Sequence, residues 1–189
     1  MKRLFVAVKI HPDSEFEGIY GELKKKLILD KIKWVESQNL HLTLKFLGKT
    51  PEEDFNRIHS VLQEVADRHF HFELSLQTAG IFGSRYDPRV IWLGTNQTQE
   101  LTTLGEDVLN SLDMAGFTRD RQNFVPHLTL GRIKYLTNKK YFQEIISQYH
   151  ETFFQKQIVE QFYLYESILN PAGPVYHVLK SYDLKKMVH

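Results

Sequence analysis

The sequence contains no cysteine among its 189 residues. Disulfide bridges, thiolate zinc sites and a cysteine nucleophile are therefore excluded. Long apolar runs are also missing. The stretch Leu4–Val8 ends at Lys9, short of the roughly 7–15 residues in the core of a signal peptide. No other run approaches the roughly 20 apolar residues of a transmembrane helix. We therefore expect a soluble, cytoplasmic protein with no membrane partner.

A strong charge of either sign is missing as well. Lysine and arginine number 24 against 23 acidic residues, which gives a formal net charge of +1. A protein that coats a long duplex normally carries a large basic excess. We therefore expect any nucleic-acid ligand to bind in a local cleft, through an end of the nucleic acid. Because low-complexity segments and Gly/Ser-rich linkers are absent, we expect residues 1–189 to form a single, two-lobed domain. We also expect this domain to be a monomer.

Hydrophobic periodicity divides the chain into alternating strands and helices. Alternating or β-branched apolar runs predict strands, and apolar residues three and four positions apart predict helices. The expected strands are 3–10, 32–35, 41–48, 70–82, 89–95, 123–130, 156–167 and 174–184, and the expected helices are 14–29, 51–68, 98–114 and 138–149.

These elements repeat once along the chain. Each half is predicted as strand, helix, a strand carrying the tetrapeptide His-Leu-Thr-Leu, helix and strand, with the run 89–95 opening the second half. With two copies only, the pattern indicates a duplicated motif and not a solenoid. We expect the halves to pack as lobes of one body.

The tetrapeptides begin at His41 and His127. Side chains alternate between the two faces of a strand, so His41 and Thr43 share one face while the leucines share the other. The same holds for His127 and Thr129. If a pseudo-twofold axis relates the halves, the two polar faces line a common groove.

Two histidines in one groove suit acid–base chemistry. The ordinary histidine pKa of about 6.5 allows one ring to be protonated and the other neutral near pH 7. One ring then protonates a leaving oxygen while the other deprotonates a nucleophile, as phosphodiester cleavage requires. Threonine hydroxyls suit the non-bridging phosphate oxygens. A single His-Leu-Thr-Leu would most often be an ordinary half-buried strand, but two copies at equivalent places favour function.

Two cations follow the motifs. Lys45 continues the face of His41 and Thr43 by alternation. Arg132 could grip phosphate through two parallel hydrogen bonds. Strict alternation places Arg132 on the leucine face, but a bulge at Gly131 would redirect it.

The segments NLHLTLKFLG at 39–48 and FVPHLTLGR at 124–132 resemble the paired motifs of the two-histidine phosphoesterase superfamily. Within it, the chain is most similar to the RNA 2′,3′-cyclic phosphodiesterases, long called 2′-5′ RNA ligases. The resemblance extends to RLFVAV at 3–8, IKWV at 32–35 and LYESIL at 164–169 with Tyr176 after it.

This resemblance implies an α+β fold of two lobes related by a pseudo-twofold axis, with antiparallel sheets facing a central cleft and helices outside. It implies hydrolysis of an RNA end or nucleotide with a 2′,3′-cyclic phosphate to a 2′-phosphomonoester, without metal or cofactor. His41 would protonate the departing 3′ oxygen and His127 would activate water. Thr43 and Thr129 would hold the phosphate, with Arg132 as a further binding residue.

Three alternatives remain open. The substrate could instead be a small cyclic nucleotide or a 2′-5′ linkage, the protein could bind nucleotides without turnover, or it could be a metalloenzyme. Phe82 and Tyr86, beside a loop containing Gly and Arg, are the best candidates for stacking on a base. His69 and His71 are interpreted as a surface strand end and not as a metal site, because no carboxylate partner is evident.

Overall fold

The computed structural model describes residues 1–96, 98–119, 124–171 and 173–186 of the chain. Its helices are α1 (Ser14–Lys26), α2 (Phe55–Ala66), α3 (Gln99–Met114) and α4 (Lys139–Gln148), with 3-10 turns η1 (Ser37–Asn39) and η2 (Glu52–Asp54). Its strands are β1 (Lys2–Lys9), β2 (Lys31–Trp34), β3 (His41–Thr50), β4 (Phe72–Gly83), β5 (Pro88–Thr95), β6 (Leu128–Tyr135), β7 (Phe153–Val159), β8 (Gln161–Asn170) and β9 (Gly173–Asp183).

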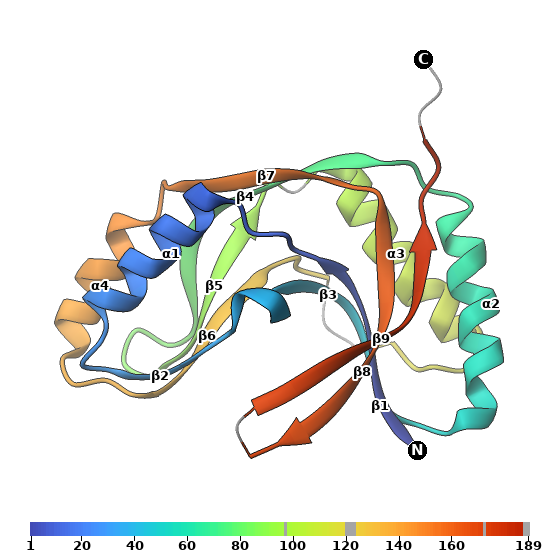
Figure 1. The fold of residues 1–189 in the computed structure, drawn as a ribbon, viewed down its shortest axis with the longest axis horizontal. Helices are drawn as coiled ribbons and strands as arrows, with labels where there is room; N and C mark the ends of the chain where they lie inside the picture. Colours follow the sequence, from blue (N-terminus) through green and yellow to red (C-terminus); the bar gives the residue numbers. More distant parts are fainter. Residues whose placement is uncertain (97, 120–123, 172, 187–189) are drawn as a thin grey trace.

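All of these strands belong to one curled antiparallel sheet (Figure 1). Its order is β7-β4-β5-β6-β3-β1-β8-β9, and β2 pairs separately with β6. The order is symmetric about its centre, because the two strands that carry His-Leu-Thr-Leu, β3 and β6, lie side by side there. Their one registered pair joins Leu42 to Leu128. The sequence-based expectation of a duplicated α+β fold is confirmed, and the sheets of its two lobes are joined at this pair.

We call β1, β3, β8 and β9 with helices α2 and α3 lobe I, and the remaining strands with helices α1 and α4 lobe II. The two lobes exchange helices. Helix α1 follows a strand of lobe I along the chain but contacts β7 of lobe II, and α3 follows a strand of lobe II but contacts β3 of lobe I. The helices lie on the outside, α1 and α4 over lobe II and α2 and α3 over lobe I (Figure 1).

The helices begin at side-chain caps and bury one face. Asp13 accepts a hydrogen bond of 2.8 Å from the backbone of Phe16 at the start of α1, and Thr98 and Asn138 cap α3 and α4 in the same way. Such caps satisfy backbone N–H groups that have no partner within the helix. No helix in the described ranges is both long enough and apolar enough to cross a bilayer.

The expected strand at 156–167 proved to be two strands, β7 and β8, which separate at Glu160. The reason is topological, because β7 pairs with β4 in lobe II whereas β8 pairs with β1 in lobe I. The chain therefore crosses between the lobes at this point. The expected strand at 123–130 begins only at Leu128, and its first residue lies outside the described residues.

Candidate active site

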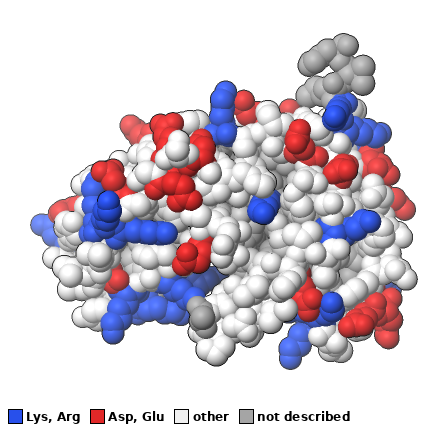
Figure 2. Space-filling model, viewed as in Figure 1, with Lys and Arg blue, Asp and Glu red and all other residues white. Residues whose placement is uncertain are grey.

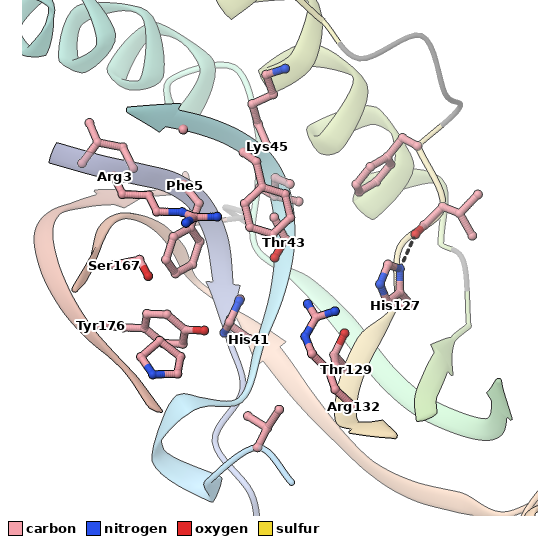
Figure 3. A pocket seen from close by; sticks show the side chains of 18 of the residues that line it. Arg3, Phe5, His41, Thr43, Lys45, His127, Thr129, Arg132, Ser167 and Tyr176 are labelled. Atoms are coloured by element: carbon pink, nitrogen blue, oxygen red, sulfur yellow. Dashed lines mark hydrogen bonds between the residues drawn. The ribbon is translucent and has the colours of Figure 1, made fainter. Parts of the chain in front are cut away.

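A cleft of about 840 Å³ lies between the lobes and is lined by residues of both His-Leu-Thr-Leu motifs (Figure 3). His41 and Thr43 reach it from β3, and His127 and Thr129 from β6 and the residue before it. The leucines between them are buried in the core. The structure therefore brings together the four motif residues that alternation placed on a common groove.

His41 is held from one side by the backbone. Its Nδ1 lies 2.7 Å from the carbonyl oxygen of Asn39, and because a carbonyl only accepts, Nδ1 carries the proton. The ring packs against Phe5 at 4.9 Å and edge-on against Tyr176 at 5.1 Å between centroids. Burial lowers the pKa of His41 below its ordinary value of 6.5, while the bond to Asn39 opposes that shift.

His127 repeats this arrangement. Its Nδ1 donates to the carbonyl oxygen of Val125 at 2.9 Å, again two residues back along the chain. The ring of Phe82 meets the imidazole edge-on at 4.7 Å between centroids. In both histidines the anchored Nδ1 fixes the tautomer and leaves Nε2 as the atom that can exchange a proton with a bound molecule.

Arg132 lines the same cleft because β6 contains a bulge. Ile91 of β5 pairs with Gly131 and Trp92 pairs with Thr129, so Leu130 is the extra residue. The bulge shifts the alternation by one position and brings Arg132 onto the threonine face. The expectation of a bulge that redirects Arg132 is confirmed.

Two features hold the bulge in place. A Cβ at Gly131 would lie 2.8 Å from Ile32 Cγ2 and 3.0 Å from Trp34 Cε3, so β2 approaches too closely for any larger residue. From the other side, the hydroxyl of Tyr20 on α1 lies 2.8 Å from the carbonyl oxygens of both Leu130 and Val35. Helix α1 thus supports the backbone that carries Arg132.

The expectation that Lys45 continues the histidine face was wrong. Ala7 pairs with Thr43 but Val6 pairs with Lys45, so a bulge at Leu44 ends the alternation. Lys45 is buried, borders the cleft and donates from Nζ to the carbonyl oxygen of Thr118 at 2.6 Å. Its ammonium points away from the histidines (Figure 3).

Arg3, Ser167 and Tyr176 also line the cleft and were not predicted as site residues. Burial raises the pKa of Tyr176, and the positive charges of Arg132 and Arg3 oppose this shift. The alternation of β1 could have revealed Arg3, since it shares a face with Phe5 and not with the core residue Leu4. Ser167 and Tyr176 meet as partners across β8 and β9, a pairing that the sequence does not show.

The two residues predicted to stack on a base, Phe82 and Tyr86, lie in different places relative to the cleft. Phe82 lines the cleft and packs against Trp92 with a centroid distance of 5.3 Å. Tyr86 is 81% exposed and lies outside the residues that line the cleft.

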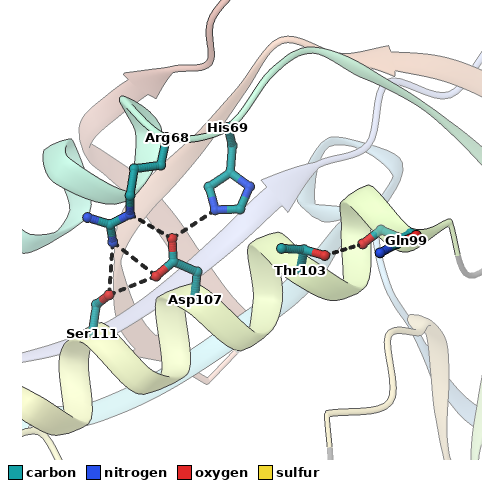
Figure 4. Close-up of polar contacts among 6 residues, drawn as sticks. All are labelled: Arg68, His69, Gln99, Thr103, Asp107 and Ser111. Atoms are coloured by element: carbon teal, nitrogen blue, oxygen red, sulfur yellow. Dashed lines mark hydrogen bonds and ion pairs between the residues drawn. The ribbon is translucent and has the colours of Figure 1, made fainter.

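His69 belongs to a separate polar cluster at the junction of α2 and α3 (Figure 4). Its Nε2 lies 2.8 Å from the carboxylate of Asp107. The same carboxylate accepts hydrogen bonds from Arg68 at 2.9 Å and from the hydroxyl of Ser111 at 2.9 Å. His69 therefore has a carboxylate partner, contrary to expectation. His71 has its Nε2 3.1 Å from the carbonyl oxygen of Leu184 and its Nδ1 3.9 Å from the carboxylate of Glu160. Across the described ranges, no group of three or more histidine or acidic side chains is arranged to hold a metal ion.

Known proteins share both the sequence and the fold. The chain is 38% identical over 181 residues to an RNA 2′,3′-cyclic phosphodiesterase of Archaeoglobus fulgidus, covering 96% of this chain and 99% of the relative. It is 33% identical to one of Methanocaldococcus jannaschii, covering 95% and 99%.

Solved structures agree with this relationship. The protein TT0787 of Thermus thermophilus superposes with a TM-score of 0.79 at 28% identity, covering 96% of this chain and 97% of that protein. E. coli LigT complexed with 3′-AMP superposes with a TM-score of 0.73 at 25% identity, covering 97% and 98%. The family model of the 2′-5′ RNA ligase superfamily matches residues 12–167. With its paired motifs on one cleft, the chain belongs to the 2′-5′ RNA ligase superfamily.

Proposed function

We propose that this protein is an RNA 2′,3′-cyclic phosphodiesterase that opens the cyclic phosphate to a 2′-phosphomonoester. The observation that carries the proposal is the matched pair of histidines, each with Nδ1 anchored on the carbonyl two residues back and Nε2 available to one cleft. The relatives described above are named for this activity, and this chain aligns with nearly their whole length.

In the proposed reaction, His127 accepts a proton from water as the water oxygen forms a bond to phosphorus. The bond from phosphorus to the 3′ oxygen breaks, and His41 gives its Nε2 proton to that oxygen. The roles of acid and base follow the family resemblance, since the two rings are anchored alike. Thr43, Thr129 and Arg132 line the same cleft and hydrogen-bond the non-bridging oxygens, whose charge grows in the transition state.

His41 must be protonated to act as the acid, yet burial lowers its pKa in the free protein. A bound phosphate supplies a negative charge beside the ring, and an opposite charge within a few ångströms favours the protonated form. Substrate binding and protonation of His41 are therefore coupled in this mechanism. The acid becomes active when there is a phosphodiester to cleave.

We further propose that the protein acts as a monomer in the cytoplasm and needs no metal. Support for the monomer comes from the cleft, which is lined by two lobes of the same chain. Support for a metal-independent reaction comes from the two rings, which supply both proton transfers. Activity that is unchanged by a chelator is the expected result, and activity restored only by an added divalent ion would contradict this part of the proposal.

The test is end-group identification after incubation with an RNA that ends in a 2′,3′-cyclic phosphate. A 2′-phosphate product is expected from the wild type. His41→Ala and His127→Ala should each lower kcat by about 10²–10⁴-fold. His150→Ala, at an exposed site after α4, is the matched control and should leave the rate unchanged.

Three results would speak against the proposal. Wild-type rates in both histidine variants would exclude paired-histidine catalysis. Tight binding of a 2′-phosphorylated nucleotide without turnover of the cyclic form would indicate a binding module. A 3′-phosphate product would mean that the two rings act on the opposite bonds from those assigned.

A further inference from the structure

We infer that the edge of lobe II carries a binding track for the RNA strand that leads into the cleft, so that the preferred substrate is an oligonucleotide and not a cyclic mononucleotide. The track, named here the basic ribbon, consists of Lys31 and Lys33 on β2 with Arg132 and Tyr135 on β6. The inference rests on the proposed function, because it assigns the substrate class of the same cleft.

Strand register places these side chains on one face of the ribbon, as two cross-strand pairs. Lys33 pairs with Arg132, which itself lines the cleft, so the two cations lie on one face of the ribbon. Lys31 lies two residues away on that face, at a spacing of about 6.6 Å along a strand. Successive cations at this interval suit successive phosphates of an extended nucleic-acid strand.

The ribbon begins at the rim of the cleft. An ideal Cβ at Gly173, the first residue of β9 after the turn that follows β8, would lie 3.6 Å from Lys33 Nζ. Leu169 and Pro174 flank that turn and line the cleft. The ammonium of Lys33 therefore lies where the hairpin of lobe I, which lines the cleft, meets the edge of lobe II.

An aromatic side chain accompanies the cations. Tyr135 pairs with Lys31 across the ribbon and is 60% exposed. Single-stranded nucleic acids are bound by basic grooves interleaved with aromatic platforms on which bases stack. The combination of cations with a neighbouring exposed ring favours RNA as the ligand. An acidic protein surface would pair with the cations but would supply no bases to stack on the ring.

The charges of the ribbon are not neutralised by neighbours. Lys31, Lys33 and Arg132 make no ion pair within the part of the chain that the structure describes. Figure 2 shows lysine and arginine side chains gathered along the lower edge of lobe II, where β2 lies in Figure 1. The net charge of +1 is thus compatible with a local basic surface.

A simpler function for the lysines is protection of an exposed edge. Within the described ranges strand β2 pairs only with β6, and lysine on an edge strand discourages pairing with other chains. If the lysines only protect the edge, their loss should affect long and short substrates alike. If they form the basic ribbon, their loss should lower kcat/KM for an oligonucleotide and not for a mononucleotide. Substrate length is therefore the variable that separates the two explanations.

The experiment compares kcat/KM for a cyclic-phosphate-ended oligonucleotide and for a cyclic mononucleotide. In Lys31→Gln/Lys33→Gln we expect about a tenfold loss on the oligonucleotide and no loss on the mononucleotide. The slope of log(kcat/KM) against log salt for the oligonucleotide should become shallower by about 1.4, for two lost phosphate contacts. Lys25→Gln/Lys140→Gln removes the same charge from exposed sites on α1 and α4 and is the matched control.

Binding of a 2′-phosphate-ended oligonucleotide and of the matching mononucleotide tests the ribbon without turnover. A weaker oligonucleotide complex in Lys31→Gln/Lys33→Gln, with an unchanged mononucleotide complex, supports it. Equal affinities and rates in this variant and the wild type would overturn the ribbon and leave the proposed function intact. Failure of the wild type to hydrolyse either cyclic substrate would instead overturn the proposed function, while the binding measurement would still decide on the ribbon.

Discussion

Leu42 and Leu128 are cross-strand partners, and each is the leucine that directly follows a cleft histidine. The second residue of one motif thus pairs with the second residue of the other at the centre of the sheet. An axis that relates the two lobes must pass through this pair. Both side chains are fully buried. The contact that joins the lobes and the side chains proposed for catalysis are therefore set by adjacent residues.

Removing either central leucine should reduce stability and activity together. We expect Leu42→Ala and Leu128→Ala each to lower the free energy of unfolding by about 2–5 kcal/mol, through lost burial and the cavity left behind. Because the two residues are in contact, the double variant should cost less than the sum. Urea denaturation measures this, and strict additivity would show that the two sites are independent.

Gly131→Ala should disturb the site without removing any side chain that lines it. The added methyl group would lie 2.8 Å from Ile32, so either β2 or the bulge must move. We expect a stability loss of about 1–3 kcal/mol from overpacking and a lower affinity for inorganic phosphate, since Arg132 follows the bulge. Gly18→Ala, where a Cβ meets nothing within 4 Å, is the control. Phosphate affinity equal to that of the wild type would contradict the positioning role.

Tyr20→Phe should weaken the support of the same bulge from the other side. It keeps the packing of the buried ring but removes the hydroxyl bonds to Leu130 and Val35, at a cost of about 1–3 kcal/mol. Tyr182→Phe is the matched control, because the buried hydroxyl of Tyr182 has no hydrogen-bond partner among the described residues, and its loss should be neutral or stabilising. Chemical denaturation of both variants gives the comparison. Equal losses would show that the ring alone matters at Tyr20.

His41 should make stability fall as the solution becomes mildly acidic. Burial lowers its pKa in the folded protein, so below about pH 6.5, the ordinary value, the unfolded chain binds the extra proton more readily. The contribution is fully present above pH 6.5 and is lost as pH falls from there toward the lowered folded value. His41→Asn should flatten the dependence of the unfolding free energy on pH in this window. Identical curves for wild type and His41→Asn would contradict the effect.

Asp107 should contribute in a lower pH range. Burial opposes its ionisation, but hydrogen bonds from Arg68, His69 and Ser111 outweigh burial and lower its pKa. The stabilisation is present above the ordinary value of 3.8 and is lost as pH falls through the folded value. Asp107→Asn should cost about 1 kcal/mol at pH 7, modest because Arg68 is 49% exposed, and should cost less below pH 4. Glu73→Gln, in an exposed pair with Lys156, is the control and should change little.

The site could be predicted wherever strict strand alternation holds. It placed His41, Thr43, His127 and Thr129 on one cleft, and the glycine of the second motif indicated the bulge that redirects Arg132. It failed at Lys45, because the bulge at Leu44 has no glycine to mark it.

The fold shows the same division between local and long-range information. Helices and most strands follow from local periodicity. The separation of β7 from β8 at Glu160 does not, because it depends on pairing with β4 and β1, two strands that are far away in the sequence. Ser167 and Tyr176 likewise reach the cleft through pairing across the sheet, which depends on residues far apart in the sequence.

The exchange of α1 and α3 between the lobes means that neither half of the chain contains all the elements against which its own helices pack. A fragment ending in the exposed turn Ser84–Asp87 would keep α1 but lack β6 and β7, against which β2 and α1 lie. Its complement would keep α3 without β3. Fragments cut at this turn should therefore be inactive apart and regain the cleft only on mixing.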